Sequence, residues 1–187
     1  MNYIIGTGWW CDDTGVHSHT KHQKYVDTST RKKDFFDLWY KSIRKFTNPQ
    51  SIIVVDSNSP VKPNLTDKED IQLISLDKNY GAALDGTSNQ RLSGWDKGVL
   101  MGASYALMCD IDYFVYVEQD CLLYGEGIIE EAISKMNRSK LMLGSGDGTP
   151  QPIQQSFFIV KKEYLPKFIM ADFMLKDKSF LKISPEK

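Results

Sequence analysis

Two acidic residues, Glu118 and Asp120, follow the apolar run 113–117 with one residue between them. Alternate side chains of an extended segment point to the same side, so the two carboxylates are expected to lie close together. At about 4 Å, two ionised carboxylates repel each other by roughly 4 kcal/mol in an effective dielectric of about 20, and a bound cation removes this penalty. Carboxylate oxygens suit Mg²⁺ or Mn²⁺, and Mg²⁺ takes one or two of them and fills its shell with water and substrate phosphates. The pair therefore predicts a divalent metal that holds a diphosphate ligand.

Polar residues and glycines follow the other apolar runs of the chain as well. They are Thr7, Gly8 and Trp9 after the run 2–6, Asp56 at the end of the run 51–56, Asn79 and Gly81 after the run 71–76, and Gln119 between the two acids. Asp56 with the serine and asparagine behind it also matches ordinary turn chemistry, and so do Asn79 and Gly81. Trp9 could stack on a base or a sugar, although a buried aromatic explains it equally well.

The elements that would position these residues alternate along the chain. Apolar runs predict strands at 2–6, 51–56, 71–76, 113–117, 140–144 and 155–160, and amphipathic spacing predicts helices at 31–46, 96–108, 126–136 and through 162–168. The last helix contains Pro166, which leaves its end open. Continuous apolar strands alternating with helices predict an α/β fold, with a mostly parallel central sheet flanked by helices. In such sheets the ligand lies at the carboxyl ends of the strands, where the polar residues gather.

Three other patterns offer competing sites. They are the acids Asp110 and Asp112, the histidines His17, His19 and His22, and the run 6–11, GTGWWC. The acids precede their strand, so they are expected at the opposite edge of the sheet. The histidine spacing could bind Zn²⁺ or Ni²⁺, but a polar loop is the simpler interpretation. The run 6–11 has cysteine where a dinucleotide fingerprint has its third glycine, and no helix follows directly.

The composition and net charge of the whole chain limit the kinds of partner that it is expected to bind. The 187 residues are 41% hydrophobic, which fits one domain over 1–187 with a core of its own. The net charge of −1 gives no electrostatic case for nucleic acid. Three widely spaced cysteines predict reduced thiols and a cytoplasmic location. The longest weakly polar run, 98–109, is shorter than the ~20 residues that a membrane-spanning helix needs, so no membrane segment is expected in this chain.

Four segments carry a resemblance to a known family when they are taken in order. They are IIVVDSNSP, ISLDKNYGAAL, GWDKGVLMGASYAL and YFVYVEQDCLLYGEGIIEEAI. Together they resemble the nucleotide-sugar half of a family-2-type glycosyltransferase with the GT-A fold, over about residues 2–165. The resemblance implies that Asp56 reads the base, that Asn79 and Gly81 form the turn after the third strand, and that Glu118 and Asp120 hold the metal on the diphosphate.

The sequence departs from that family in three places. The first metal-motif acid is Glu118 where the family has aspartate, and GTGWW replaces the usual Pro-x-Tyr-Asn after the first strand. The segment 95–98, WDKG, stands where the family commonly has Arg-Asn-x-Gly. Arg91 and Lys97 are therefore the cations best placed by sequence to contact phosphate.

The resemblance implies a metal-dependent transferase that moves a sugar from a UDP- or GDP-sugar to an acceptor hydroxyl of a sugar or glycan. The donor half would cover about 2–125 and a shortened acceptor half about 126–187. Asp147 and Asp172 are the two acids considered for the general base. The alternative is a GT-A-like module that binds a nucleotide sugar without catalysis, as part of a larger assembly. A sugar-phosphate nucleotidyltransferase shares this architecture, but it should have a glycine-rich loop with arginine and lysine after the first strand. The loop 6–15, GTGWWCDDTG, contains no lysine or arginine, so this class is disfavoured.

Overall fold

A computed structural model gives the structure of the chain, and it describes residues 1–13, 28–81, 92–148 and 153–175. Six strands form one sheet in the order β3-β2-β1-β4-β6-β5. The strands are β1 (Tyr3–Trp9), β2 (Ser51–Asp56), β3 (Ile71–Ser75), β4 (Tyr113–Val117), β5 (Leu141–Ser145) and β6 (Ile153–Lys161). β1 to β4 are mutually parallel, and β6 runs antiparallel to both β4 and β5. The predicted mostly parallel sheet is confirmed.

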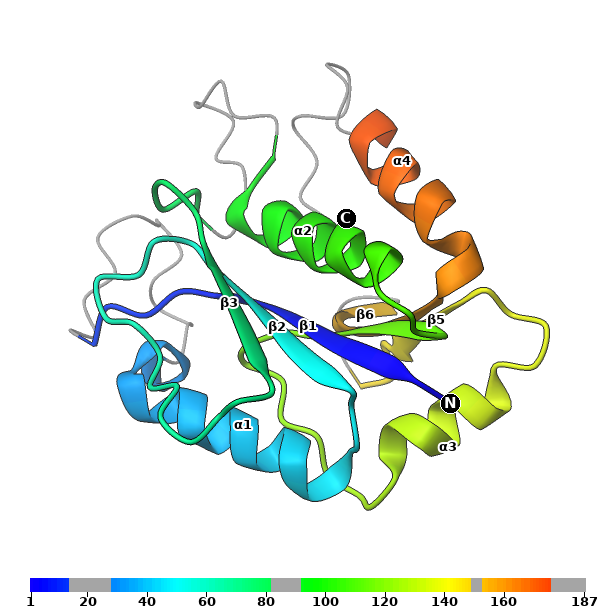
Figure 1. The fold of residues 1–187 in the computed structure, drawn as a ribbon, viewed down its shortest axis with the longest axis horizontal. Helices are drawn as coiled ribbons and strands as arrows, with labels where there is room; N and C mark the ends of the chain where they lie inside the picture. Colours follow the sequence, from blue (N-terminus) through cyan, green and yellow to red (C-terminus); the bar gives the residue numbers. More distant parts are fainter. Residues whose placement is uncertain (14–27, 82–91, 149–152, 176–187) are drawn as a thin grey trace.

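Helices cover both faces of this sheet, which confirms the predicted architecture (Figure 1). The helices are α1 (Lys33–Phe46), α2 (Gly94–Met108), α3 (Ile128–Lys135) and α4 (Leu165–Leu175), with short 3-10 turns η2 (Thr28–Arg31) and η3 (Lys162–Tyr164). α1 and α3 pack on one face, and α2 and α4 pack on the other. Pro166 lies in the first turn of α4, where its missing N–H breaks no helical bond.

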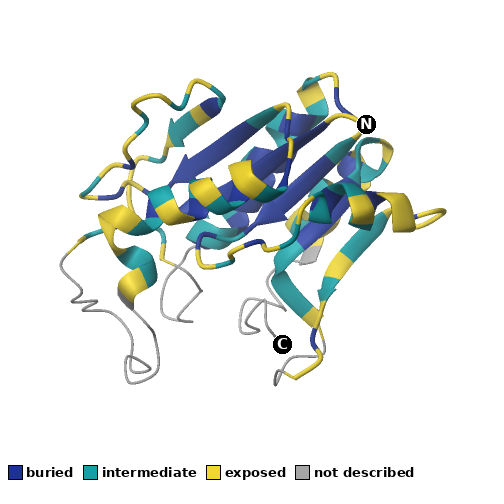
Figure 2. Cartoon of the chain, turned by 90° about the horizontal axis from the view of Figure 1, so that it is seen from below, coloured by how far each residue is buried: buried dark blue, intermediate teal, exposed yellow. Residues whose placement is uncertain are grey.

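Two apolar clusters, one on each face of the sheet, make up the core. Trp39 and Phe36 of α1 anchor one cluster, and Phe114 and Tyr116 of β4 contribute to the other. Figure 2 shows the buried strands between helices whose outer positions are exposed. Because both faces are covered, the central strands are apolar at successive positions and do not alternate with polar residues.

Close backbone contact fixes α2 against β1. A Cβ on Gly98 would lie 2.9 Å from the Cα of Gly8, so this approach requires glycine at position 98. A capping box begins the helix: Ser93 Oγ accepts from the backbone N–H of Asp96, and the Asp96 carboxylate accepts from the Ser93 N–H. α2 therefore starts at a defined point beside the carboxyl end of β1.

The ends of the strands correct one sequence expectation and confirm another. β1 extends to Trp9, so Thr7, Gly8 and Trp9 belong to the strand and do not form a loop behind it. Asp112 accepts from the Asn2 N–H at 2.9 Å, which confirms that this acid lies at the edge where β1 begins. Among the described residues, no helix is long and apolar enough to cross a membrane.

Candidate functional site

The carboxyl ends of the parallel strands meet at one edge of the sheet. In the ladder register, Trp9 of β1 is level with Asp56 of β2, and Asp56 is level with Ser75 of β3. β4 ends beside them at Val117. β5 reaches the same edge, because it runs antiparallel to β6, which itself runs antiparallel to β4. The residues that follow these five strands form the candidate site.

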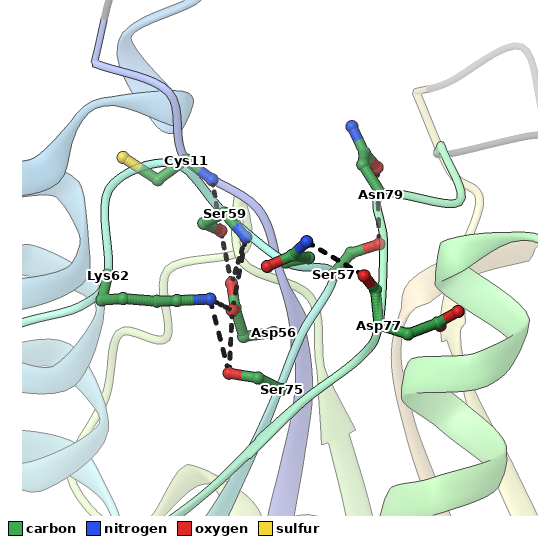
Figure 3. A network of polar contacts seen from close by, with 9 residues as sticks. Cys11, Asp56, Ser57, Ser59, Lys62, Ser75, Asp77 and Asn79 are labelled. Carbon is green, nitrogen blue, oxygen red and sulfur yellow. Dashed lines mark hydrogen bonds and ion pairs between the residues drawn. The ribbon is translucent and has the colours of Figure 1, made fainter.

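Asp56 is fully buried, and the chain itself supplies donors to both carboxylate oxygens (Figure 3). Oδ1 accepts from the Ser59 backbone N–H at 3.1 Å and from the Ser59 hydroxyl. Oδ2 accepts from the Ser75 hydroxyl at 3.1 Å and from the ammonium of Lys62. Ser59 Oγ also accepts from the Cys11 N–H at 2.9 Å, which links the cluster to the segment after β1. The sequence places Asp56 at the ligand edge, and the structure places its carboxylate beneath other groups.

Lys62 covers Asp56 from the solvent side and is a site residue that the sequence does not reveal. Its side chain is 46% exposed, whereas the Asp56 side chain is 0% exposed. The ammonium lies 3.4 Å from Ser75 Oγ in addition to its ion pair with Asp56. From the sequence, a lysine in a polar connection between strands is expected to be an ordinary surface cation. No local pattern could therefore have identified Lys62 as a site residue.

The loop after β3 is joined to β2 and to the start of α2. Asn79 Oδ1 accepts from the Gly81 N–H at 2.9 Å and from the Ser57 hydroxyl at 3.4 Å. The Gly94 N–H donates to the Gly81 carbonyl at 2.7 Å. Gly81 has φ 74°, a conformation that suits glycine. Asn79 and Gly81 thus form the expected turn, and Figure 3 shows the Asn79 amide nitrogen pointing away from the network.

Lys97 is brought to this edge by α2. Its ammonium lies 4.0 Å from the ring centroid of Tyr80, a cation–π contact. The Tyr80 hydroxyl in turn donates to Asp77 at 2.7 Å. The N-terminus of α2 and a lysine in its first turns together give a positive potential that suits phosphate. Arg91, the other predicted cation, lies outside the described residues.

Glu118 and Asp120 lie in a tight turn at the end of the central strand β4. The Cys121 N–H donates to the Glu118 carbonyl at 2.9 Å, so the backbone turns here and the expected extended conformation is wrong. Asp120 is exposed and Glu118 is half-buried.

Burial raises the pKa of the Tyr116 phenol well above its usual value, and the charges of Glu118 and Asp120 raise it further. Burial, Asp120 and Glu118 likewise raise the pKa of Cys121 to about 11. Both carboxylates therefore act on the same two neighbours.

The turn supplies two carboxylates, so a divalent metal bound there would take most of its ligands from a substrate or from water. No group of three or more histidine, cysteine, aspartate or glutamate ligands occurs in the part of the chain that the structure describes. Two carboxylates at an open edge are the donor set with which Mg²⁺ retains water and phosphate oxygens. Glu118 and Asp120 could hold such an ion only together with a bound diphosphate or water.

Gln119, between the two acids, points inward and is 2% exposed. Its Oε1 accepts from the Trp10 N–H at 2.8 Å, and its Nε2 donates to the carbonyls of Trp10 at 3.2 Å and Thr30 at 2.7 Å. The amide therefore ties the segment after β1 and the turn η2 to the end of β4. In this arrangement Gln119 positions the edge, although the sequence suggested a ligand contact.

The structure separates the remaining predicted residues. Thr7 and Trp9 are buried, and Trp9 packs edge-on against Phe36 with ring centroids 4.8 Å apart, so the buried alternative is the correct one for Trp9. Asp147 is exposed after β5, at the site edge. Asp172 lies in α4, a helix that begins near the opposite edge after β6. The three histidines lie outside the described residues.

A second missed cation, Arg31, lies at the end of η2. Gln119 holds this turn against β4 through the Thr30 carbonyl, and the Arg31 charge lowers the pKa of Tyr116 against the larger effect of burial. The Arg31 charge therefore acts on the same buried phenol whose pKa Glu118 and Asp120 raise. The position of Arg31 depends on a long-range contact that the sequence does not reveal.

No protein-family model and no curated protein matches the sequence. Solved structures do match. The first is a mannosyltransferase from Pyrobaculum calidifontis in complex with GDP-Man and Mn²⁺, with TM-score 0.56, 11% identity, and coverage of 89% of this chain and 46% of that chain. The second is the galactosyltransferase LgtC in complex with donor and acceptor sugar analogs, with TM-score 0.54, 12% identity, and coverage of 98% and 68%. The third is the bifunctional IspDF from Campylobacter jejuni, with TM-score 0.53, 10% identity, and coverage of 95% and 48%.

The chain has the GT-A fold. At these identities the likeness shows the architecture alone, and the GT-A structures that share it include both glycosyltransferases and nucleotidyltransferases. The chain spans about half the length of the mannosyltransferase. The fold identified from the ordered motifs is therefore confirmed.

Proposed function

We propose that this chain is a metal-dependent glycosyltransferase that transfers a sugar from a UDP- or GDP-sugar to an acceptor hydroxyl of a sugar or glycan. One observation carries the proposal: the Glu118–Asp120 turn projects from the central strand at the carboxyl edge of a GT-A sheet. Ligands of open α/β sheets bind at that edge. The mannosyltransferase of similar fold was solved with GDP-Man and Mn²⁺, which supports a nucleotide sugar and a divalent metal as the ligands to test.

The donor would lie along the edge from β2 to β4. Its base would occupy the end near Asp56 and Lys62, and its diphosphate would lie between the N-terminus of α2 with Lys97 and the Glu118–Asp120 turn. Glu118 and Asp120 would hold Mn²⁺ or Mg²⁺, which when bound neutralises charge on the leaving diphosphate. Lys97 and the first N–H groups of α2 would add positive potential at the same phosphates.

If the configuration of the sugar is inverted, the reaction requires a base as well as a bound donor. The acceptor oxygen forms a bond to the anomeric carbon, the bond from that carbon to the diphosphate oxygen breaks, and the hydroxyl proton passes to a carboxylate. Asp147 is exposed at the site edge, which favours it over Asp172 for this role. The three free cysteines fit a cytoplasmic location for this chemistry.

Calorimetric titration tests the donor site directly. The purified chain is titrated with UDP, GDP and their sugar conjugates, with Mn²⁺ and again with a chelator. Metal-dependent binding of one nucleotide is expected, and its loss in Asp120→Ala with an unchanged melting temperature would assign the metal to this turn. Absence of nucleotide binding under every condition would overturn the proposal.

Catalysis is tested separately from binding. A bound donor that slowly releases free sugar to water is expected for an active transferase, and Asp147→Asn should reduce transfer to the acceptor more than it reduces donor binding. Donor binding without hydrolysis or transfer would leave the non-catalytic binding module as the function.

A further inference from the structure

The Asp56 carboxylate cannot meet a ligand in the arrangement that the structure shows. Its side chain is fully buried, and its two oxygens accept from Ser59, Ser75 and Lys62 (Figure 3). An N–H group of a base would have to displace the Lys62 ammonium or the Ser59 turn to reach it. A carboxylate that loses a charged donor in a buried place gives up a strong hydrogen bond, so this displacement is unfavourable.

Lys62 has the donor capacity that Asp56 cannot offer. An ammonium carries three N–H groups, and the structure gives two acceptors for them among the described residues, Asp56 Oδ2 and Ser75 Oγ. The side chain is 46% exposed and lies over the end of β2, on the same edge as the Glu118–Asp120 turn. One N–H is thus available on the solvent side, at a point fixed from below by a buried carboxylate.

We propose that Lys62 is the residue that reads the base, by donating to a carbonyl oxygen, and that Asp56 is a positioning residue that holds the Lys62 ammonium in place. The inference rests on the proposed function and names the chemistry of its substrate. A donor at this point selects a base with a carbonyl acceptor, such as uracil or guanine. It disfavours adenine, whose corresponding exocyclic group is an amine that also donates.

The selectivity follows from pairing of hydrogen-bonding groups. Once a bound base covers the oriented Lys62 ammonium, a base without an acceptor there leaves an N–H unpaired, and such a loss discriminates between ligands more strongly than a change of shape in an apolar pocket. The Asp56–Lys62 pair carries no net charge, so the base end of the site would recognise hydrogen-bonding pattern, while the phosphate end would recognise charge.

Lys62→Met tests this inference, because methionine keeps much of the length of lysine and removes the donor. Binding of UDP, GDP and ADP is measured with Mn²⁺ for the original chain, for Lys62→Met and for Lys62→Arg. We expect UDP or GDP to bind at least about tenfold more tightly than ADP in the original chain, as the loss of one hydrogen bond from a charged donor implies. Lys62→Met should abolish most of that preference, and Lys62→Arg should retain it.

Lys68→Met is the matched control. Lys68 lies in the same connection between β2 and β3 and also pairs with an acid, Asp37 at 3.0 Å, but this pair lies against α1 and not at the strand ends. Its replacement should leave the base preference unchanged. Melting temperatures of all variants show whether each chain is folded, so a loss of selectivity is not mistaken for a loss of structure.

The other outcomes are distinct. If Lys62→Met binds UDP or GDP more tightly and with greater preference, then Lys62 blocks Asp56 and the carboxylate reads the base, which overturns the inference. If the preference is unchanged, Lys62 does not contact the base, which also overturns it while leaving the proposed function intact. If the original chain binds no nucleotide, the proposed function fails and this inference fails with it.

Discussion

Asp56 and Asp120 stand at the same edge of the same sheet and have opposite environments. Asp56 ends β2 and is fully buried, with donors from Ser59, Lys62 and Ser75 on its oxygens. Asp120 follows β4 in a tight turn and is exposed. Both satisfy the rule that polar residues collect at the carboxyl ends of parallel strands, yet only Asp120 presents its carboxylate to solvent.

The difference comes from what the chain does after each strand. The segment after β2 folds back over the strand end and returns a backbone N–H, a hydroxyl and an ammonium to the carboxylate. The segment after β4 turns sharply and buries Gln119 in place of the acids. An acid at a strand end is therefore available to a ligand only where the following segment brings no donors back to it. Replacement of a residue whose polar atoms are bonded within the protein should therefore lower the free energy of unfolding more than replacement of an exposed acid.

Replacement of Asp56 should have the largest effect on stability. Asp56→Ala leaves the Ser59 N–H and two hydroxyls without their acceptor in a buried place, and we expect a loss of about 3 kcal/mol. Urea denaturation measures this loss when the curves of the variant and the original chain are fitted with one slope for the dependence of the free energy of unfolding on urea. Asp56→Asn, which keeps one carbonyl oxygen, should lose less. A loss in Asp56→Ala no larger than that of a surface substitution would contradict the burial described for this carboxylate.

Replacement of Gln119, the buried residue between Glu118 and Asp120, should have the next largest effect on stability. Gln119→Leu removes the partners of the Trp10 N–H and carbonyl and of the Thr30 carbonyl, so we expect a loss of about 2 kcal/mol. The exposed Gln72 of β3 is the control, and Gln72→Leu should change stability by less than about 0.5 kcal/mol. Equal effects of the two changes in chemical denaturation would show that Gln119 does not hold the edge together.

Ser75 should have a smaller effect, because it supplies only one of the donors to Asp56. Ser75→Ala is expected to cost about 1 kcal/mol, the typical net value of a single hydrogen bond. Ser134, whose hydroxyl donates to the Glu131 carbonyl on the exposed surface of α3, provides the comparison. If Ser134→Ala is as destabilising as Ser75→Ala, the Asp56 cluster has no special place in the stability of the fold.

Asp120 should have the smallest effect on stability and the clearest effect on ligands. Asp120→Asn is exposed, so we expect a change within about 0.5 kcal/mol. Addition of Mn²⁺ with a nucleoside diphosphate should raise the melting temperature of the original chain, because a ligand that binds only the native state stabilises it. The rise should disappear in Asp120→Asn and persist in Asp112→Asn at the opposite edge. Persistence of the rise in Asp120→Asn would remove the metal from this turn.

Local patterns were sufficient for the elements and their order. Each predicted strand and helix occurs, since apolar runs and helical spacing express directly which faces must be buried. The sequence failed at the end of β1, where the segment from Thr7 onward looked like a loop. Gly8 instead lies within the strand and against Gly98 of α2, whose missing Cβ permits the close approach, and such a contact between segments far apart in the chain leaves no local signal.

The sequence by itself determined the α/β architecture, the edge at which the acids gather and the ordered motifs from which the GT-A fold could be recognised. The tertiary structure alone decided which polar side chains are hydrogen-bonded within the protein and which remain exposed for a ligand. Lys62 reaches Asp56, and Gln119 reaches the Thr30 carbonyl, through connections whose paths depend on packing across the whole sheet. Burial and hydrogen bonding are properties of the assembled neighbours, so residue type and spacing predict where a side chain lies but not whether its polar atoms are already satisfied.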